Sequence, residues 1–159
     1  MVVAPRFPDP SDVEVDWQVE PALLDDAAVA AAVRAALAHG GRAGLHVGVV
    51  LVDDATLAEL HDRWLGDPSP TDVIAFDLSD GDPDESGPQG ELYVSVDCAR
   101  RVAAELGGNP ARELALYLVH GSLHLCGHDD HEPDERAAMR AAEAAVLAEL
   151  GYPQGPPVD

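Results

Sequence analysis

The histidines of this chain concentrate in one short stretch. Four of the seven lie between His120 and His131, in the segment HGSLHLCGHDDH. His120 and His124 are four residues apart, so on a helix their rings lie on one face with Cβ atoms about 5–6 Å apart. Two imidazoles in that arrangement can bind one zinc ion at about 2.0–2.1 Å. The spacing therefore predicts a metal site at the end of a helix.

A third ligand is expected from the chain that follows this helix. Gly127 is expected to end the helix, so that the chain turns and a later side chain reaches the ion. His131 fits that role, and His128, Asp129 and Asp130 are the alternatives. Three protein ligands leave a fourth position open to water. An open position is typical of a catalytic zinc site, whereas a structural site is usually closed by four protein ligands.

The alternative is that the two histidines are ordinary polar residues at a helix end. They stand at the end of an apolar segment, LALYLVHGSLHL, where a desolvated histidine needs a partner, and this favours the metal site. Metalloproteases of the helical zinc motif carry a glutamate directly after the first histidine, as the general base. Gly121 occupies that position here, which argues against a peptidase. Cleavage of a phosphodiester gains from charge neutralisation by the ion, so phosphate-ester hydrolysis fits this sequence better.

Three segments of the chain resemble motifs of one known family. The segment from His120 to Asp129, HGSLHLCGHD, is similar to the motif H-G-x-L-H-L-x-G-[YH]-D-H of the YbeY family of ribosomal RNA maturation factors. The segments TDVIAF (Thr71–Phe76) and GELYVS (Gly90–Ser95) resemble two further family segments, in the same order along the chain. The resemblance spans about Asp53 to Leu150, and the histidine motif is its most specific part.

The resemblance implies an activity and its setting. It implies a metal-dependent, single-strand-specific endoribonuclease with one Zn²⁺ per chain. Such a protein would act in the cytoplasm, in maturation of the 3′ end of 16S ribosomal RNA and in ribosome quality control. Its partners would be ribosomal RNA and proteins of the small ribosomal subunit.

The resemblance also assigns residues to the site. It implies that His120 and His124 bind the metal and that His120 belongs to the catalytic group. The last histidine of the family motif stands ten residues after the first, at the position of Asp130 here, and this chain has His131 one residue later. One extra loop residue has a small entropic cost. We therefore expect His131 to be the third ligand, with Asp129 or Asp130 orienting an imidazole; Asp130 as a direct ligand is the alternative.

Two features favour a different role. Many family members have an arginine shortly before the T-D-V segment, and Leu65 occupies that position here. The chain has nine arginines, no lysine and thirty acidic residues, a net charge of −21 that repels polyanions. An assembly factor without nuclease turnover, or a small metallohydrolase on another substrate, are therefore the alternatives. A metal ion and a few arginines could still form a local positive patch; Arg100 and Arg101 are either part of it or simply solvated.

Periodicity and capping signals predict one mixed α/β domain over residues 13–151. Residues 1–12 are expected to be a loose N-terminal segment and 152–159 a flexible tail. No apolar run approaches the length of about 18 residues that crosses a bilayer, so no membrane association is expected. The predicted fold is a single mixed sheet of about four strands covered by helices, with a hairpin-like link between the last two strands. The predicted strands are 13–20, 45–52, 71–78 and 90–97, and the predicted helices begin near Pro21, Asp53, Asp97, Asn109 and Pro133.

Overall fold

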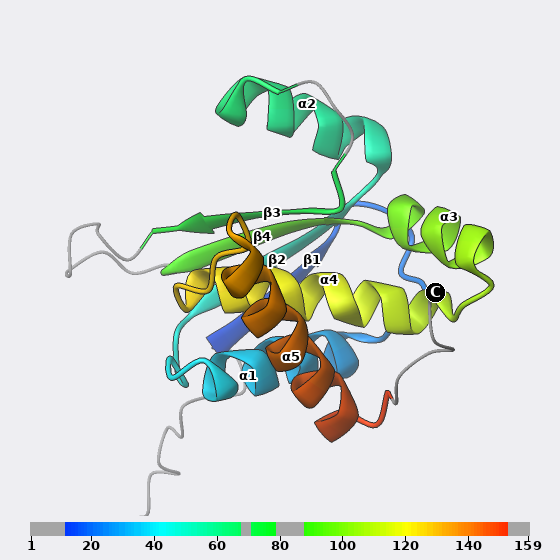
Figure 1. Ribbon diagram of the computed structural model, residues 1–159. Coiled ribbons are helices and arrows are strands. Elements are labelled where there is room, and N and C mark those ends of the chain that lie inside the picture. Colours follow the sequence, from blue (N-terminus) through cyan, green and yellow to red (C-terminus); the bar gives the residue numbers. More distant parts are fainter. Residues whose placement is uncertain (1–11, 68–70, 79–87, 153–159) are drawn as a thin grey trace, which may run out of the picture.

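The computed structural model describes residues 12–67, 71–78 and 88–152 (Figure 1). Strands and helices follow one another in the predicted order. Their bounds are β1 (Val13–Trp17), α1 (Asp26–His39), β2 (Val47–Val52), α2 (Asp54–Leu65), β3 (Val73–Asp77), β4 (Gly90–Ser95), α3 (Val96–Leu106), α4 (Pro110–Leu125) and α5 (Pro133–Glu149). No helix in the described part of the chain is both long and apolar enough to cross a membrane.

The strands form one mixed sheet, as predicted. Their order across the sheet is β1-β2-β4-β3. β1 and β4 both run parallel to β2, whereas β3 pairs antiparallel with β4. The antiparallel pairing of β3 and β4, expected from a hairpin-like link, is therefore confirmed. Every residue of β2 is buried, because this central strand is covered on both faces.

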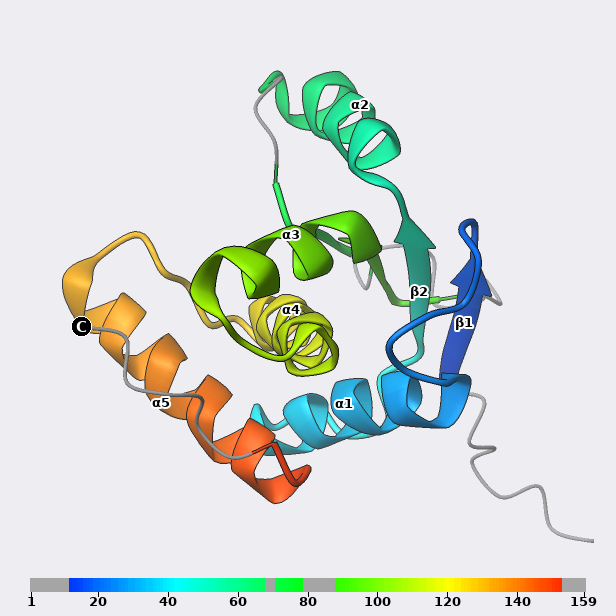
Figure 2. The same ribbon diagram turned by 90° about the vertical axis from the view of Figure 1, so that its right-hand side faces the viewer.

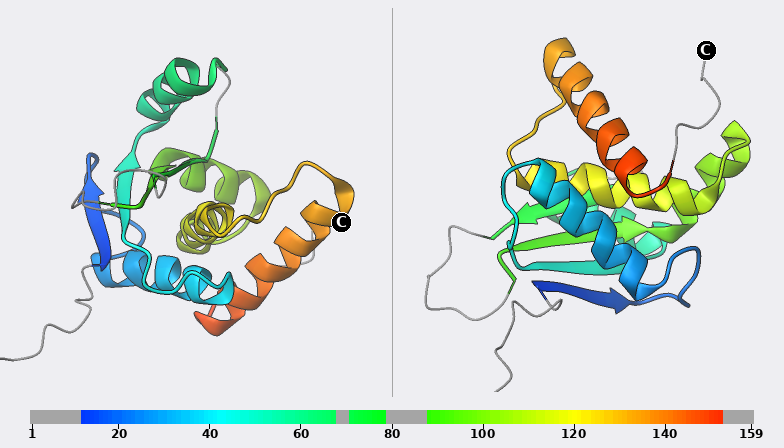
Figure 3. Two further views of the ribbon diagram at one scale, coloured as in Figure 1. Left: turned by 90° about the vertical axis from the view of Figure 1, so that its left-hand side faces the viewer. Right: turned by 90° about the horizontal axis from the view of Figure 1, so that it is seen from below.

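Helices lie on both faces of the sheet (Figures 1 and 3). α1, α4 and α5 lie on one side, and α2 lies alone on the other. The main core is formed between the sheet and the first group of helices. A smaller cluster forms between α2 and the sheet, from Leu57 of α2 and the strand residues Val50, Val52 and Ile74. α4 runs through the centre of the molecule, with α3 and α5 on either side of it (Figure 2). It is therefore held in place by neighbouring helices on both sides.

Two predicted helix starts were wrong. Pro21 does not open a helix, because Leu23 has a positive φ of 72° and Asp25 is the N-cap, its carboxylate accepting from the backbone N–H of Ala28 at 2.8 Å. Asp97 is not a cap either. Ser95 caps α3 by accepting from the N–H of Cys98 at 3.0 Å, and Asp97 lies in the first turn. The capping acceptor of α3 thus lies two residues before the predicted one, at Ser95. That of α1 lies four residues after Pro21, at Asp25.

The ends of the domain extend slightly into the predicted loose segments. Most of residues 1–12 and 152–159 lie outside the described residues. Asp12 accepts a hydrogen bond from Arg34 at 2.9 Å, and Tyr152 packs against the main core. The division of the chain into a loose segment, one domain and a tail stays a prediction.

The N-terminal half of α4 fixes the register of the helix that carries the histidines. Asn109 caps it, accepting from the N–H of Ala111 at 2.9 Å, and Pro110 occupies the first turn, as predicted. Leu114 and Leu118 are fully buried against the core. Because the first turns of α4 are anchored, the side chains of its last turns, including the two histidines, also point in fixed directions.

Gly121 allows α4 to approach the sheet closely. A Cβ atom at this position would lie 2.9 Å from Cδ2 of Leu92 and 3.0 Å from Cγ2 of Val73. A side chain would therefore push the helix away from the sheet. The residue after the first histidine faces the core and not the candidate site, so a glutamate placed here could not serve as a base in this fold.

Candidate metal site

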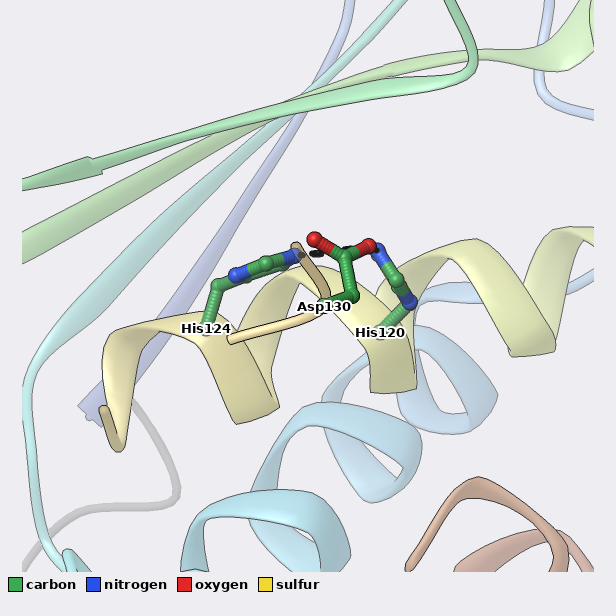
Figure 4. Close-up of side chains that lie close together, drawn as sticks. All are labelled: His120, His124 and Asp130. Atoms are coloured by element: carbon green, nitrogen blue, oxygen red, sulfur yellow. Dashed lines mark hydrogen bonds and ion pairs between the residues drawn. The ribbon is translucent and has the colours of Figure 1, made fainter. Parts of the chain in front are cut away.

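The last two turns of α4 and the loop after them bring three polar side chains together (Figure 4). Nε2 of His120 and Nε2 of His124 are 3.0 Å apart. The Oδ2 atom of Asp130 lies 3.5 Å from the first and 3.7 Å from the second. All three side chains are partly buried. α4 supplies the two imidazoles by its four-residue spacing, and Gly127, with a φ of 93°, turns the chain so that Asp130 returns to them.

This donor set fits a zinc ion. Donor atoms bound at about 2.0–2.1 Å in a tetrahedron lie about 3.3 Å from one another. The three measured separations, 3.0, 3.5 and 3.7 Å, are close to that value. Two imidazole nitrogens and one carboxylate oxygen are also the ligand types that zinc takes in catalytic sites, where three protein ligands leave one position open.

His131, the expected third ligand, lies outside this group. Its side chain is 80% exposed, and its Nε2 is 3.2 Å from Oδ1 of Asp129. Asp129 also accepts a hydrogen bond from the backbone N–H of Asp130 at 2.8 Å, which holds the loop in this conformation. The structure thus brings Asp130, the alternative, to the two imidazoles. Its position, ten residues after His120, is also the one that the family motif gives to its last histidine.

A residue that the sequence did not suggest completes the site. Oε2 of Glu143, on α5, lies 2.5 Å from Nδ1 of His120, and its side chain is only 13% exposed. A carboxylate can only accept, so Nδ1 of His120 carries the proton and Nε2 faces the other donors. A carboxylate in this position fixes the tautomer and orientation of a metal-binding histidine. Glu143 thus makes the contact to a His120 nitrogen that was expected of Asp129 or Asp130 as the orienting residue.

The two imidazoles have opposite pKa shifts. Burial lowers the pKa of His120, but the hydrogen bond and charge of Glu143, with the charges of Asp72 and Asp130, outweigh it and raise that pKa above the usual 6.5. Burial, and then the neighbouring His120, lower the pKa of His124. Without metal, His120 therefore takes up a second proton more readily than His124 does, and in that form it donates to Glu143 through Nδ1 and to His124 through Nε2. A metal ion would take the place of that second proton.

Zinc affinity is accordingly expected to depend on pH. Below the raised pKa of His120, binding must displace one proton, so the logarithm of the affinity should rise with pH with a slope of about one. Above that pKa the proton is already gone, and the affinity should level off. Titration calorimetry in buffers of different ionisation enthalpy would measure the proton released. An affinity that stays constant below the raised pKa would contradict this account of the site.

Two of the three donors, His120 and Asp130, line a cavity of about 520 Å³. It lies among α3, α4 and α5, and Asp72, just before β3, also lines it; the charge of this carboxylate acts on His120. The lining residues are Thr71, Asp72, Cys98, Arg101, Val102, Glu113, Leu116, Tyr117, His120, Asp130, Arg136, Met139, Arg140 and Glu143. A volume of this size suits a small ligand or a short portion of a polymer.

Comparisons with known proteins agree on one family for this chain. The sequence model of the family described as endoribonuclease YbeY matches residues 15–151. The chain belongs to the endoribonuclease YbeY family. It is 40% identical to the Endoribonuclease YbeY of Rhodopirellula baltica, with 89% of this chain and 76% of that protein aligned. It is 38% identical to that of a Roseiflexus species, with 89% of this chain and 95% of that protein aligned.

Two further matches show how far the similarity extends in sequence and in structure. The Endoribonuclease YbeY of Mycolicibacterium gilvum is 41% identical over 65% of this chain, and the chain spans 62% of that protein, less than two thirds. A solution structure of a Thermotoga maritima protein aligns with a TM-score of 0.57 at 22% identity, covering 87% of this chain and 91% of that one. This second match shows that the fold is shared.

The position where many YbeY family members carry an arginine has an apolar surface here. Leu65, the last residue of α2, is 59% exposed, and Trp64 beside it is 63% exposed. The ring of Trp64 makes an edge contact with Phe76 at a centroid distance of 6.1 Å. Arg63 pairs with Glu59 at 3.6 Å within the same helix, and it is absent from the lining of the cavity beside the histidines. Any arginine that assists phosphate binding must come from another element.

Proposed function

We propose that this protein is a metal-dependent endoribonuclease that uses one zinc ion per chain. The observation that carries the proposal is the triangle of His120 Nε2, His124 Nε2 and Asp130 Oδ2, of which His120 and Asp130 line the cavity. Membership of the endoribonuclease YbeY family supports RNA as the substrate. His120, His124 and Asp130 would hold the ion, and Glu143 would keep the His120 ring in place.

A zinc ion bound there would supply Lewis-acid stabilisation of the charge that develops on the phosphate. The protein contributes the rest. Glu143 holds the proton of His120 on Nδ1, which leaves Nε2 free to ligate. Asp130 places a negative charge beside both rings and balances the charge of the cation. The apolar lining residues Met139 and Leu116 reduce the amount of water around the reacting groups, which strengthens the electrostatic interactions there.

The proposed substrate is single-stranded RNA, and the proposed role is maturation of the 3′ end of 16S ribosomal RNA and quality control of ribosomes in the cytoplasm. Family membership supports this role. Proteins of the small ribosomal subunit are the proposed partners. They are typically basic, and a net charge of −21 would steer such partners toward the chain.

Cleavage of RNA by the purified full chain tests the activity. We expect a labelled single-stranded RNA to be cut in the presence of zinc, a duplex of the same sequence to stay intact, and a chelator to stop cleavage until zinc is restored. Absence of cleavage at any zinc concentration, by a protein shown to bind zinc, would refute the nuclease proposal. That result would support the alternative of a metal-stabilised assembly factor, which the exposed Leu65 at the arginine position favours.

Two substitutions test whether Asp130 or His131 is the third ligand. Asp130→Asn is expected to weaken zinc binding by at least about tenfold, because a neutral amide oxygen replaces a carboxylate beside the cation. His131→Asn should leave the affinity unchanged, since that side chain is 80% exposed and directed to Asp129. Competition titration with a zinc chelator would measure both. The reverse pattern would show that the loop rearranges on binding and that His131 ligates, as the sequence-based prediction has it.

A further inference from the structure

Arginines are concentrated around the cavity that borders the candidate metal site. Three of the nine arginines of the chain line it, Arg101 from α3 and both Arg136 and Arg140 from α5. The two helices lie on either side of α4 (Figure 2). In a protein with thirty acidic residues, this is a local concentration of arginine side chains beside the histidines. The three arginines differ in how they are paired.

Two of the three have no carboxylate partner in the described part of the chain. Arg101 pairs with Asp54, at the start of α2. Nη1 of Arg136 donates to the backbone carbonyl of His131 at 2.9 Å, which leaves its charge uncompensated. Arg140 makes neither a hydrogen bond nor an ion pair within residues 12–67, 71–78 and 88–152. Arginines on an acidic protein usually form ion pairs with carboxylates. Because Arg136 and Arg140 have no such pair among the described residues, they have N–H donors available for a ligand.

The position of the pair within α5 disfavours a structural role. Arg136 and Arg140 are four residues apart, so they lie on one face of the helix as like charges, which destabilises a helix slightly. Arg136 is also near the N-terminus of α5, which begins at Pro133, where the helix dipole disfavours positive charge. Among the residues that the structure describes, neither side chain has an ion pair with a carboxylate. Local stability therefore does not explain why the two arginines face the cavity.

The charge of the cavity depends on the metal. Its lining has three arginines and four carboxylates, Asp72, Glu113, Asp130 and Glu143. Of these, Asp130 and Glu143 are engaged with His120. With His120 counted as neutral, the formal charge of the lining is −1 without an ion and +1 with a divalent cation. A bound divalent cation would therefore favour the binding of an anion there.

We propose that Arg136 and Arg140 form a phosphate-binding pair for the RNA strand, at the phosphate next to the one that faces the metal site. The guanidinium groups present planar sets of donors that match phosphate oxygens. The pair would supply from α5 the phosphate contact that Leu65 cannot make from α2. This inference rests on the proposed function, because it takes RNA as the ligand.

Binding and cleavage, measured separately, test the pair. The variants are Arg136→Gln, Arg140→Gln and the double variant, and Arg100→Gln is the matched control, an exposed arginine of α3 that does not line the cavity. The probe for binding is a short single-stranded 2′-O-methyl phosphorothioate oligonucleotide, which resists cleavage but keeps its charges. We expect each variant to raise the dissociation constant of the zinc-loaded protein roughly tenfold, with no change for the control. The dependence of binding on salt should also fall by about 0.7 in logarithmic slope for each arginine–phosphate pair that a substitution removes.

Each outcome has a distinct meaning. Zinc affinity should be the same in all variants, which excludes damage to the metal site. If the wild-type protein binds the probe through Arg136 and Arg140 but cuts no RNA, the phosphate pair stands and the nuclease proposal fails. If it cuts RNA and the double variant binds and cuts as well as Arg100→Gln does, the pair is refuted and the nuclease proposal stands. Failure of the wild-type protein to bind the probe at low salt would also refute the pair.

Discussion

Replacement of His124 by alanine is expected to reduce zinc affinity by more than about 100-fold and to abolish RNA cleavage. The substitution removes one of three donors, and removal of a ligand should exceed the effect of about 10–100-fold that is typical when an outer partner of a ligand is removed. Nε2 of His124 is 3.0 Å from Nε2 of His120 and 3.7 Å from Asp130, so no other described side chain of the group can replace it. Zinc analysis of the purified variant and a cleavage assay measure the two effects.

His39→Ala is the matched control for this substitution. His39 is exposed at the end of α1 and does not belong to the donor group. It should retain both zinc and activity. Folding of His124→Ala without zinc is checked by circular dichroism, since the ring is only partly buried and its removal leaves the core intact. Equal RNA cleavage by His124→Ala and wild type would mean that the metal triangle is not where the chemistry occurs.

Glu143→Gln is expected to lower zinc affinity by about 10–100-fold while the fold is retained. The amide is nearly isosteric with the carboxylate, so packing around the 13%-exposed side chain is preserved. It carries no charge, so it neither strengthens the Nδ1–H donor of His120 nor orients the ring as firmly. Calorimetry or chelator competition at a fixed pH would measure the decrease.

The same variant should shift the pH dependence of binding in a defined direction. Glu143 is the strongest influence that raises the pKa of His120, so its neutralisation should lower that pKa. Zinc would then compete with the proton only at lower pH, and the rise of affinity with pH should end earlier than in the wild type. Glu149→Gln, at an exposed position of the same helix, is the control and should change neither quantity. An unchanged pH profile in Glu143→Gln would show that the carboxylate has no control over the imidazole.

The local sequence specifies the helix and the paired histidines. Asn109 and Pro110 start α4, the spacing of Leu114 and Leu118 sets its buried face, and Gly127 ends it. The four-residue interval between His120 and His124 then puts their rings together, because the period of the helix is fixed by the backbone. The mixed sheet and the order of strands and helices follow from similar short-range signals, and the motif residues were enough to indicate the family.

The remainder of the site depends on contacts between segments far apart in the chain. The loop after Gly127 offered several donors, and its folded conformation directs Asp130 to the imidazoles and His131 to solvent. Glu143 reaches His120 across 23 residues, because α5 packs against α4. Arg136 and Arg140 line the cavity for the same reason. Such contacts arise from the packing of whole helices, which depends on many distant side chains at once and leaves no periodic signal in the sequence.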